Sequence, residues 1–407
     1  MPTGFFPLSA VTEPERVPTI PLCGQCKLHK SCKSPKMPVT GKGRRKVLVV
    51  AEAPGEQEDE QGIQLIGKSG QYLRDTLSDI DVDLDRDCWK TNAVICRPPK
   101  NEVNDIHIES CRPNLNKTIK ELNPTAIILL GGSPVKSLIG QLWKAGESPG
   151  GIGRWAGWQI PSQKLNAWVC PTFHPAYLLR KHDVSLELWF KRHLQEALAL
   201  SGRPWEEGVP DFASQVEIIY ESDKAARIVR RMTERGGTVA FDYETNMLKP
   251  DHKDSRIVCC SVCWEGMKTI AFPWHGEVVT AMGELLRSNV AKVGANNKFE
   301  QRWTRKEFGH GVRNWVWDCM TVAHILDYRP LITSVKFQAF VQLGQTCWDG
   351  VVGPYLRADS GYEKNRIKEV DLGTLLMYCG MDSLCEWMIA EKQKTTMARA
   401  ASNTSFG

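Results

Sequence analysis

The sequence has no long apolar segment and no recognisable leader. No run of roughly eighteen apolar residues occurs, so a membrane-spanning helix is not expected. The start, Met1-Pro2-Thr3-Gly4, does not resemble a signal peptide. Internal repeats and low-complexity blocks are also missing from the sequence. We therefore expect a soluble cytoplasmic protein of a bacterium or a phage-infected host cell, with no membrane partner.

Charge of one sign is not abundant either. The net charge is +5, and charged residues make up 24% and hydrophobic residues 42% of the 407 residues. These values are ordinary for globular protein, and the mild positive charge permits binding to a polyanion without requiring it. A chain of this length has room for two or three domains, each with its own core. Its 14 cysteines would suit a disulfide scaffold only in a much shorter secreted chain, so they are interpreted as metal ligands and buried thiols.

Cysteines in the first half have the spacing of a metal site. Cys23 and Cys26 form a C-x2-C pair, Cys32 follows closely, and Cys96 and Cys111 lie further along. Four cysteines in one domain fit either tetrahedral zinc or a 4Fe–4S cluster, and spacing alone does not choose between them.

The segment around these cysteines predicts an α/β domain. Residues 46–50 and 126–130 are apolar runs typical of buried strands, and a helix is expected to begin near residues 67–71. Strands that alternate with helices indicate a parallel sheet with ligands at the carboxyl ends of its strands.

Residues from about Leu22 to Leu200 resemble the family-four uracil-DNA glycosylases. The resemblance rests on the cysteines and on three segments, which are Ala51-Glu52-Ala53-Pro54-Gly55, Thr91-Asn92-Ala93-Val94 and Thr172-Phe173-His174-Pro175. It implies a parallel-sheet glycosylase-like fold and a 4Fe–4S cluster on Cys23, Cys26, Cys96 and Cys111, with Cys32 as a bystander. It also implies cleavage of the N-glycosidic bond of a flipped base.

The resemblance assigns three catalytic roles in that reaction. Asn92 would read the pyrimidine edge, because an amide offers both a donor and an acceptor. His174 would stabilise the departing uracil anion. Glu52, with Glu58 or Asp59 nearby, would orient water and stabilise positive charge on the sugar.

Three positions depart from the glycosylase pattern. Leu65 stands where the family has an aromatic that stacks on uracil, Ile95 replaces a lysine, and Ala51 replaces a glycine. Base–aromatic stacking contributes about 1–3 kcal/mol, so its loss weakens base binding about tenfold or more. Two interpretations stay open: uracil excision, or a retained fold that holds DNA or a partner without excising bases.

The second half contains an acidic strand. The β-branched run 238–240 leads into Phe241-Asp242-Tyr243-Glu244-Thr245, and strand alternation places Asp242 and Glu244 on the same side. Two carboxylates so close repel unless a divalent cation lies between them, and hard oxygen ligands suit Mg²⁺ or Mn²⁺.

Two later motifs complete a familiar set. Glu300 follows Asn296-Asn297-Lys298-Phe299, and Tyr378 and Asp382 have the i, i+4 spacing of one helix face. From Val216 to Lys392 the chain resembles the tyrosine-bearing DEDD-type 3′–5′ exonucleases, which include the proofreading domain of family A DNA polymerases. This implies an RNase H-like mixed sheet, two Mg²⁺ or Mn²⁺ ions on Asp242, Glu244, Glu300 and Asp382, and a Tyr378 that orients the attacking water. Glu300 occupies a position where aspartate is usual.

Other residues of this half are interpreted more plainly. Asp318 is expected to cap a helix rather than bind metal. Cys259, Cys260 and Cys263 are expected to be buried thiols on an apolar strand. The basic residues Lys336, Lys364, Arg366 and Lys368 lie either along a DNA path or in solvent.

The predicted organisation is therefore a glycosylase-like domain at 1–202, a linker at 203–215, an exonuclease domain at 216–395 and a tail at 396–407. DNA is the expected substrate, single-stranded 3′ ends in particular, with a family A polymerase domain or subunit as a possible partner. The combination resembles the front end of certain phage-type polymerases. The competing hypothesis is a DNA-tethering or polymerase-docking module with degraded active sites.

Overall fold

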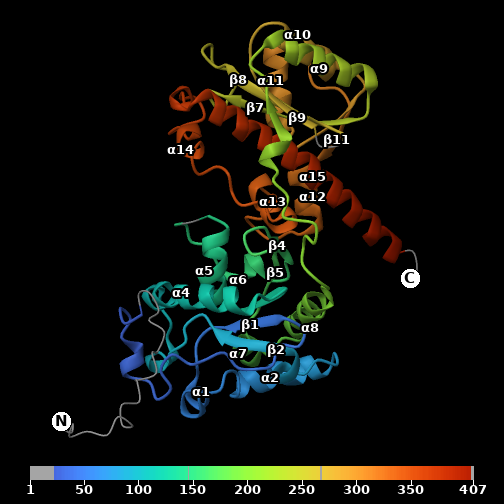
Figure 1. The fold of residues 1–407 in the computed structure, drawn as a ribbon. Helices are drawn as coiled ribbons and strands as arrows, with labels where there is room; N and C mark the ends of the chain where they lie inside the picture. Colours follow the sequence, from blue (N-terminus) through green and yellow to red (C-terminus); the bar gives the residue numbers. More distant parts are fainter. Residues whose placement is uncertain (1–22, 145, 266–267, 405–407) are drawn as a thin grey trace, which may run out of the picture. The chain divides into compact units, whose positions relative to one another are not determined.

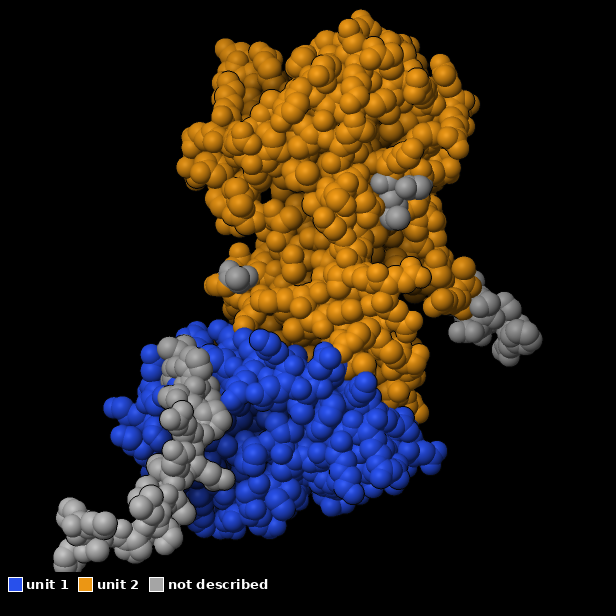
Figure 2. Space-filling model, in the orientation of Figure 1, with its two compact units in different colours: residues 1–124 blue, residues 125–407 orange. Residues whose placement is uncertain are grey.

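The computed structural model describes residues 23–144, 146–265 and 268–404. Residues 1–22 of the predicted first domain and 405–407 of the predicted tail lie outside the described residues. The chain divides into two compact units, residues 1–124 and 125–407, coloured separately in Figure 2. The predicted linker lies within the second unit, and its residues 203–212 contain no helix or strand. The predicted domain limits stay predictions.

The first unit contains a pair of parallel strands. Strand β1 (Val47–Ala51) is buried along its whole length, and β2 (Cys88–Asn92) pairs with it in a register that sets Ala51 opposite Asn92. Its helices are α1 (Glu56–Gln61), α2 (Lys68–Ser78), α3 (Leu84–Asp87) and α4 (Asp105–Leu122), with 3-10 turns at Leu28–Lys30 and Pro99–Asn101. The carboxyl ends of β1 and β2 therefore lie side by side, which brings the segments of Glu52 and Asn92 together.

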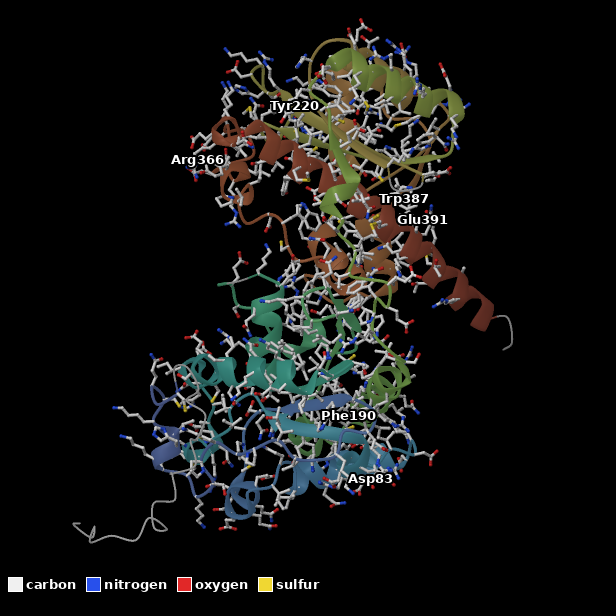
Figure 3. All side chains as sticks on the ribbon, viewed as in Figure 1. Asp83, Phe190, Tyr220, Arg366, Trp387 and Glu391 are labelled. Atoms are coloured by element: carbon white, nitrogen blue, oxygen red, sulfur yellow. The ribbon has the colours of Figure 1, made fainter. Side chains whose placement is uncertain are left out.

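The second unit begins with three strands. Strand β3 (Ala126–Leu130) pairs in parallel with β5 (Ala167–Thr172), whereas β4 (Ile160–Ser162) pairs with β5 in the antiparallel sense. The predicted parallel arrangement therefore ends in an antiparallel edge strand. Four helices accompany these strands: α5 (Gly132–Leu142), α6 (Ile152–Trp155), α7 (Pro175–Lys181) and α8 (Val184–Ala199). Phe190, labelled in Figure 3, anchors α8 through a fully buried ring.

A mixed six-stranded sheet follows in the same unit, in the order β11-β10-β7-β8-β9-β6. Its strands are β6 (Val216–Ile218), β7 (Thr238–Thr245), β8 (Ile257–Trp264), β9 (Lys268–Pro273), β10 (Ala291–Gly294) and β11 (Trp315–Asp318). The central pairs β7–β8 and β8–β9 are antiparallel, while β10 pairs in parallel with both β7 and β11, and β6 with β9.

Helices cover both faces of this sheet. They are α9 (Ser222–Arg235), α10 (Glu277–Arg287), α11 (Lys298–Phe308), α12 (Cys319–Leu326), α13 (Val335–Leu343), α14 (Gly353–Leu356) and α15 (Leu372–Thr404), with 3-10 turns at Ala213–Gln215 and Ile367–Glu369. Along β7, Phe241 and Tyr243 enter the core formed with α9 and α10, whereas Ala240 enters the core formed with α13 and α15. Asp242 alternates with Phe241 and Tyr243, so its side chain belongs to the α15 face. Figure 1 shows α15 running beside β7 and β9, and it continues through most of the predicted tail.

An aromatic cluster joins α13 to the first part of the same unit. Trp155 of α6 lies 5.2 Å from the Phe337 ring and 5.8 Å from the Phe340 ring, and Trp143 lies 5.9 Å and 5.1 Å from them. The guanidinium of Arg154 lies over Phe337 at 4.5 Å. Residues 125–199 and the exonuclease-like segment thus share buried aromatic packing. Within the described residues, no helix is at once long and apolar enough to cross a bilayer.

Candidate active sites

The β7 carboxylates are the centre of the first candidate site. Asp242 is half-buried and Glu244 is buried, and they face Ser261 and Cys259 across the β7–β8 ladder. The register of a strand fixes both side chains on the α15 face, as the sequence alternation predicts.

Helix α15 brings the third motif to these carboxylates. The Ser261 hydroxyl donates to the Cys379 carbonyl at 2.7 Å and contacts the Ser383 hydroxyl at 2.8 Å, which fixes α15 against β8. The Cys379 thiol lies 3.8 Å from Oδ2 of Asp242, and suitable ligand atoms of Asp242, Glu244 and Cys379 all lie within 4.8 Å of one another. The charge of Asp382 acts on both β7 carboxyl groups and helps to raise their pKa values. The segments predicted to meet therefore do meet.

Burial makes this site electrostatically unfavourable without cations. Desolvation is the largest cause that raises the pKa of Asp242, Glu244, Glu300 and Asp382. Glu300, on the first turn of α11, is 3% exposed, and its Oε2 has no hydrogen-bond partner. Buried carboxylates with free oxygen atoms are the donor set that hard divalent cations prefer, so the residues fit such ions.

Asp318 holds the second motif in place. It accepts hydrogen bonds from the backbone of Met320 and Thr321 at 3.0 Å each, which caps α12 as expected. The same carboxylate accepts from Asn297 N at 2.9 Å, just before α11 begins. Asp318 therefore positions the segment that carries Glu300.

Two further charged residues belong to this site: Lys336, which the sequence placed either on a DNA path or in solvent, and Glu386, which sequence reasoning did not single out. Lys336 of α13 donates to Tyr378 Oη at 2.9 Å and forms an ion pair with Asp382, so it does not lie free in solvent. Glu386, one turn after Asp382 on α15, is 3% exposed with an unpartnered Oε2, and its pKa is raised by burial and by Asp242. The i+4 spacing of Glu386 from Asp382 was a usable signal, whereas nothing in the sequence pairs Lys336 with Tyr378.

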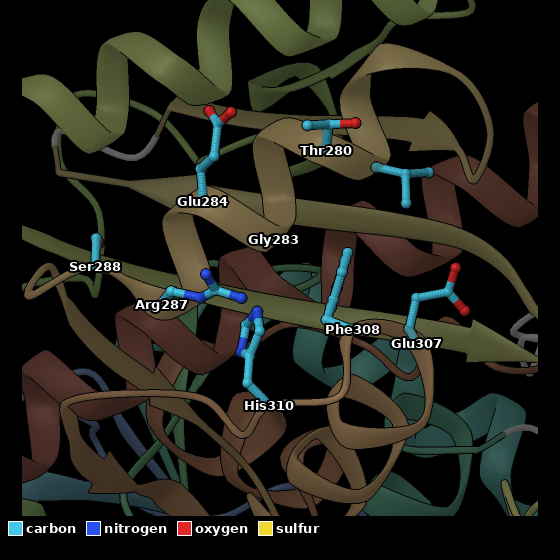
Figure 4. A pocket seen from close by; sticks show the side chains of 9 residues that line it. Thr280, Gly283, Glu284, Arg287, Ser288, Glu307, Phe308 and His310 are labelled. Carbon is cyan, nitrogen blue, oxygen red and sulfur yellow. The ribbon is translucent and has the colours of Figure 1, made fainter.

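The structure also shows the surroundings of the β8 cysteines and of Lys364, for which expectations follow from the sequence. Cys259, Cys260 and Cys263 are fully buried thiols on β8, as predicted. Lys364 pairs with Asp254 at 3.1 Å between exposed side chains, which is the arrangement of a solvated surface pair. Figure 4 shows a surface pocket lined by α10 and the end of α11; none of the predicted site residues lines it.

The predicted cluster cysteines line one small cavity in the first unit. Cys23, Cys26, Cys96 and Cys111 face it together with His29, Ile95, Ser110 and Asn114. All four cysteines are free thiols. Burial raises the pKa of Cys96 to about 12 and that of Cys111 to about 11, so these thiols are poor anions unless a metal takes the proton's place. Converging thiols around an enclosed space fit a metal centre.

Cys32 is outside that lining but is not remote from it. Its thiol hydrogen-bonds with Cys96, and burial raises its pKa. The Cys96 sulfur also accepts a hydrogen bond from Lys36 N at 3.2 Å. Cys32 therefore lies beside the predicted ligand Cys96 and not among the residues that line the cavity.

The predicted glycosylase residues lie in both units. Glu52 directly follows β1, and Asn92 ends β2 with 2% exposure and donates to the Gln64 side chain. His174 lies in the second unit, where it precedes α7 and accepts from Ala176 N through Nδ1 at 3.1 Å. The pairing of Ala51 with Asn92 places the segments of Glu52 and Asn92 side by side, and the catalytic roles of the three residues stay predictions.

The loop after α1 carries the aliphatic Leu65 at the position where the glycosylase pattern has an aromatic that stacks on uracil. Leu65 is 6% exposed with φ 56°, a left-handed conformation that leucine seldom adopts. Glu58 accepts from Ile66 N and Gly67 N at 3.0 and 2.8 Å. Asp59 accepts from the backbone of residues 33 and 34. Both carboxylates therefore hold loops, and the suggested part of Glu58 or Asp59 in orienting water stays a prediction.

Comparison with known proteins supports both predicted resemblances. Residues 38–199 match the model of the uracil DNA glycosylase superfamily, and residues 216–342 match a 3′-5′ exonuclease model, which ends before α15. A type-4 uracil-DNA glycosylase of Pyrobaculum aerophilum is 38% identical over 166 residues, 39% of this chain and 80% of that protein. A DNA polymerase of Bacillus phage SP01 is 23% identical over 325 residues, 72% of this chain but 34% of that protein.

Among solved structures, the catalytic core of RRP6 from Trypanosoma brucei is similar at 14% identity with a TM-score of 0.35. The match covers 46% of this chain and 48% of that one, so the chain spans about half of its length. The predicted combination of a glycosylase-like and an exonuclease-like part is confirmed by the family models.

Proposed function

We propose, from the premise that this chain belongs to the type-4 uracil-DNA glycosylase family through its N-terminal half, that it is a DNA-processing enzyme whose second half is a metal-dependent 3′–5′ exonuclease. The single observation that supports the nuclease best is the meeting of Asp242 and Glu244 on β7 with Asp382 on α15. Buried acids from separate elements raise one another's pKa values, which is a feature of functional sites rather than of stable packing.

Four carboxylates would hold the ions: Asp242, Glu244, Glu300 and Asp382. Two divalent cations, Mg²⁺ or Mn²⁺, would supply an activated water and stabilisation of the leaving 3′ oxygen. Tyr378 would hold that water through its phenol, which faces the same group of acids. Glu300, on α11, occupies a position where aspartate is usual. It keeps the carboxylate but places it one methylene further from the helix, which would change the spacing of the bound ions. The product would be 5′-mononucleotides released one at a time from a 3′ end.

A gel assay tests the nuclease. Labelled single-stranded DNA should shorten from its 3′ end with Mg²⁺ or Mn²⁺, and Asp242→Ala should abolish shortening. The matched control is Asp359→Ala, because Asp359 is an exposed acid outside the site. Wild-type protein that binds DNA but never shortens it with either ion would refute the proposal.

For the first unit we propose a 4Fe–4S cluster on Cys23, Cys26, Cys96 and Cys111. When bound, the cluster would link the N-terminal segment to the segments around β2 and α4. Purified protein should be brown and contain about four iron atoms per chain. Cys96→Ser should lower the iron content, whereas Cys32→Ser should leave it unchanged. Colourless protein with stoichiometric zinc would contradict the iron assignment.

Uracil excision by Glu52, Asn92 and His174 is the finer proposal for the first half. Uracil-containing DNA should yield abasic sites with wild type and not with Asn92→Ala. A second candidate, DNA binding without excision, is favoured by the buried Leu65 and by the Asn92–Gln64 hydrogen bond. Uracil-DNA binding by wild type without any abasic product would select this second candidate.

The cellular setting is also a proposal. Both halves act on nucleic acid in the families they match, so DNA is the proposed substrate and the cytoplasm the proposed compartment. The similarity to a phage polymerase supports a family A polymerase domain or subunit as partner. Co-purification of a polymerase that extends primers, with mismatched 3′ ends removed by this chain, is the expected result.

A further inference from the structure

Lys336 occupies a position between two functional groups of α15. Its ammonium group donates to Tyr378 Oη at 2.9 Å and lies at hydrogen-bond distance from Oδ1 of Asp382. The same group lies 4.6 Å from the Tyr378 ring centre and 5.1 Å from that of Trp348. The side chain is 19% exposed, so most of it is removed from water.

The geometry of α13 explains why Lys336 reaches this place. The Ser334 side chain accepts from Phe337 N at 3.3 Å and caps the helix, so Lys336 lies in its first turn. The next residue, Phe337, is fully buried against Trp155 at 5.2 Å. A buried anchor directly after the lysine restricts the directions available to the lysine side chain.

The hydrogen bond from Lys336 constrains the phenol. A tyrosine hydroxyl has one proton to donate and lone pairs that accept. Because Lys336 donates to the oxygen, the phenolic proton is directed to another acceptor, and the Asp382 carboxylate accepts it in this structure. The cation also lies over the ring face, 4.6 Å from the ring centre, which restricts rotation of the ring about the Cβ–Cγ bond.

The ion pair with Asp382 has a second consequence. Asp382 is one of the proposed metal ligands, and a cation already in contact with it competes with a divalent ion for the same carboxylate. Without the lysine, the buried acids would repel one another more strongly and would attract a divalent ion more strongly.

We propose that Lys336 is a positioning residue of the exonuclease centre. It holds the Tyr378 phenol in one orientation and moderates the affinity of Asp382 for the divalent ion. This inference rests on the proposed exonuclease function. It concerns how that site is organised rather than which reaction it performs.

Metal binding without DNA is the first measurement. Mn²⁺ titration followed by electron paramagnetic resonance of the free ion should give a Kd about tenfold lower for Lys336→Met than for wild type. Lys336→Arg keeps the charge and should stay close to wild type. The matched control is Lys224→Met, because Lys224 is an exposed lysine paired with Glu217 away from the acids.

Turnover is the second measurement. Lys336→Met should lower kcat at least about tenfold at saturating Mn²⁺ with little change in KM, because the phenol loses its orientation while DNA contacts remain. Lys336→Arg should recover part of the rate. In a Tyr378→Phe background the same Lys336→Met substitution should have little further effect, because the group that the lysine positions is already gone.

The outcomes separate this inference from the proposed function. Tighter Mn²⁺ binding together with a loss of kcat that Tyr378→Phe suppresses supports it. Unchanged Mn²⁺ affinity in Lys336→Met overturns it whatever the rate does, as does a rate loss that persists in full in the Tyr378→Phe background. A wild-type protein that neither binds Mn²⁺ nor shortens DNA overturns the exonuclease proposal itself, and this inference with it.

Discussion

Truncation of Trp155 should destabilise the exonuclease half, although Trp155 lies outside the exonuclease-like segment. Its side chain is fully buried on α6, and its ring lies 5.2 Å from Phe337 and 5.8 Å from Phe340 of α13. Its indole N–H donates to the Pro149 carbonyl at 2.8 Å. Since α13 also carries Lys336, this packing should affect the nuclease site.

The expected magnitude follows from these contacts. Replacement of a buried Trp by Ala usually lowers the free energy of unfolding by about 3–5 kcal/mol, through lost burial and the cavity left behind. The Pro149 carbonyl also loses its donor, which adds about 1 kcal/mol. We therefore expect Trp155→Ala to lower stability by about 4 kcal/mol or more, and the melting temperature by about 10 °C.

Two readouts test this reasoning together. Thermal unfolding is followed by far-ultraviolet circular dichroism, and the exonuclease rate is measured after graded heating. Both should shift to lower temperature in Trp155→Ala. The control is Trp189→Ala, since Trp189 is 52% exposed on α8 and should change stability by less than about 1 kcal/mol. An exonuclease rate that survives heating as in wild type, while another part of the protein melts early, would refute the shared-core argument.

Three further predictions concern stability alone. Burial lowers the pKa of His193 to about 4, so the unfolded chain takes up a proton first as pH falls. The free energy of unfolding should therefore fall by about 2 kcal/mol between pH 6.5 and 4. In urea titrations, His193→Gln should flatten that slope. Gly344 has φ 70°, and an added Cβ would lie 1.6 Å from the Pro161 carbonyl oxygen, so Gly344→Ala should lower stability by about 3 kcal/mol or more. Gly350→Ala, in open space, should have little effect, and equal losses in both variants would contradict the clash. Burial raises the pKa of Glu386, so the free energy of unfolding should fall as pH rises. Glu386→Gln should stabilise the chelator-treated protein by about 1 kcal/mol at pH 8 and not at pH 5. Equal gains at the two pH values would argue against a buried charge at Glu386.

Local patterns in the sequence predicted much of the exonuclease site. Strand alternation is a property of the backbone, so it places Asp242 and Glu244 on one face whatever the surroundings. The i, i+4 spacing of Tyr378 and Asp382 likewise follows from helix geometry. The capping role of Asp318 is also local, since its carboxylate accepts from the backbone N–H groups of Met320 and Thr321 in the first turn of α12.

Contacts between distant elements could not be predicted in this way. Lys336 meets Tyr378 across 42 positions of the sequence, and the contact depends on how α13 lies against α15. The Trp155–Phe337 packing depends in the same way on the placement of α6 beside α13. Neither pairing has a period or spacing that a single sequence displays, because side chains on separate helices meet only after those helices pack.

The two halves differ in whether the polar groups of their proposed sites already have hydrogen-bond partners within the protein. In the exonuclease half, Glu300 and Glu386 each have a buried carboxylate oxygen without a hydrogen-bond partner. In the other half, the Asn92 amide already donates to Gln64, and Leu65 has its side chain buried rather than open to a base. A base could be read there only after the Asn92–Gln64 bond is exchanged for a bond to the base. That exchange returns one hydrogen bond for another and gains little, and without an aromatic face there is no stacking energy to add to it. The local geometry therefore favours cations at the exonuclease acids more strongly than it favours uracil at Asn92.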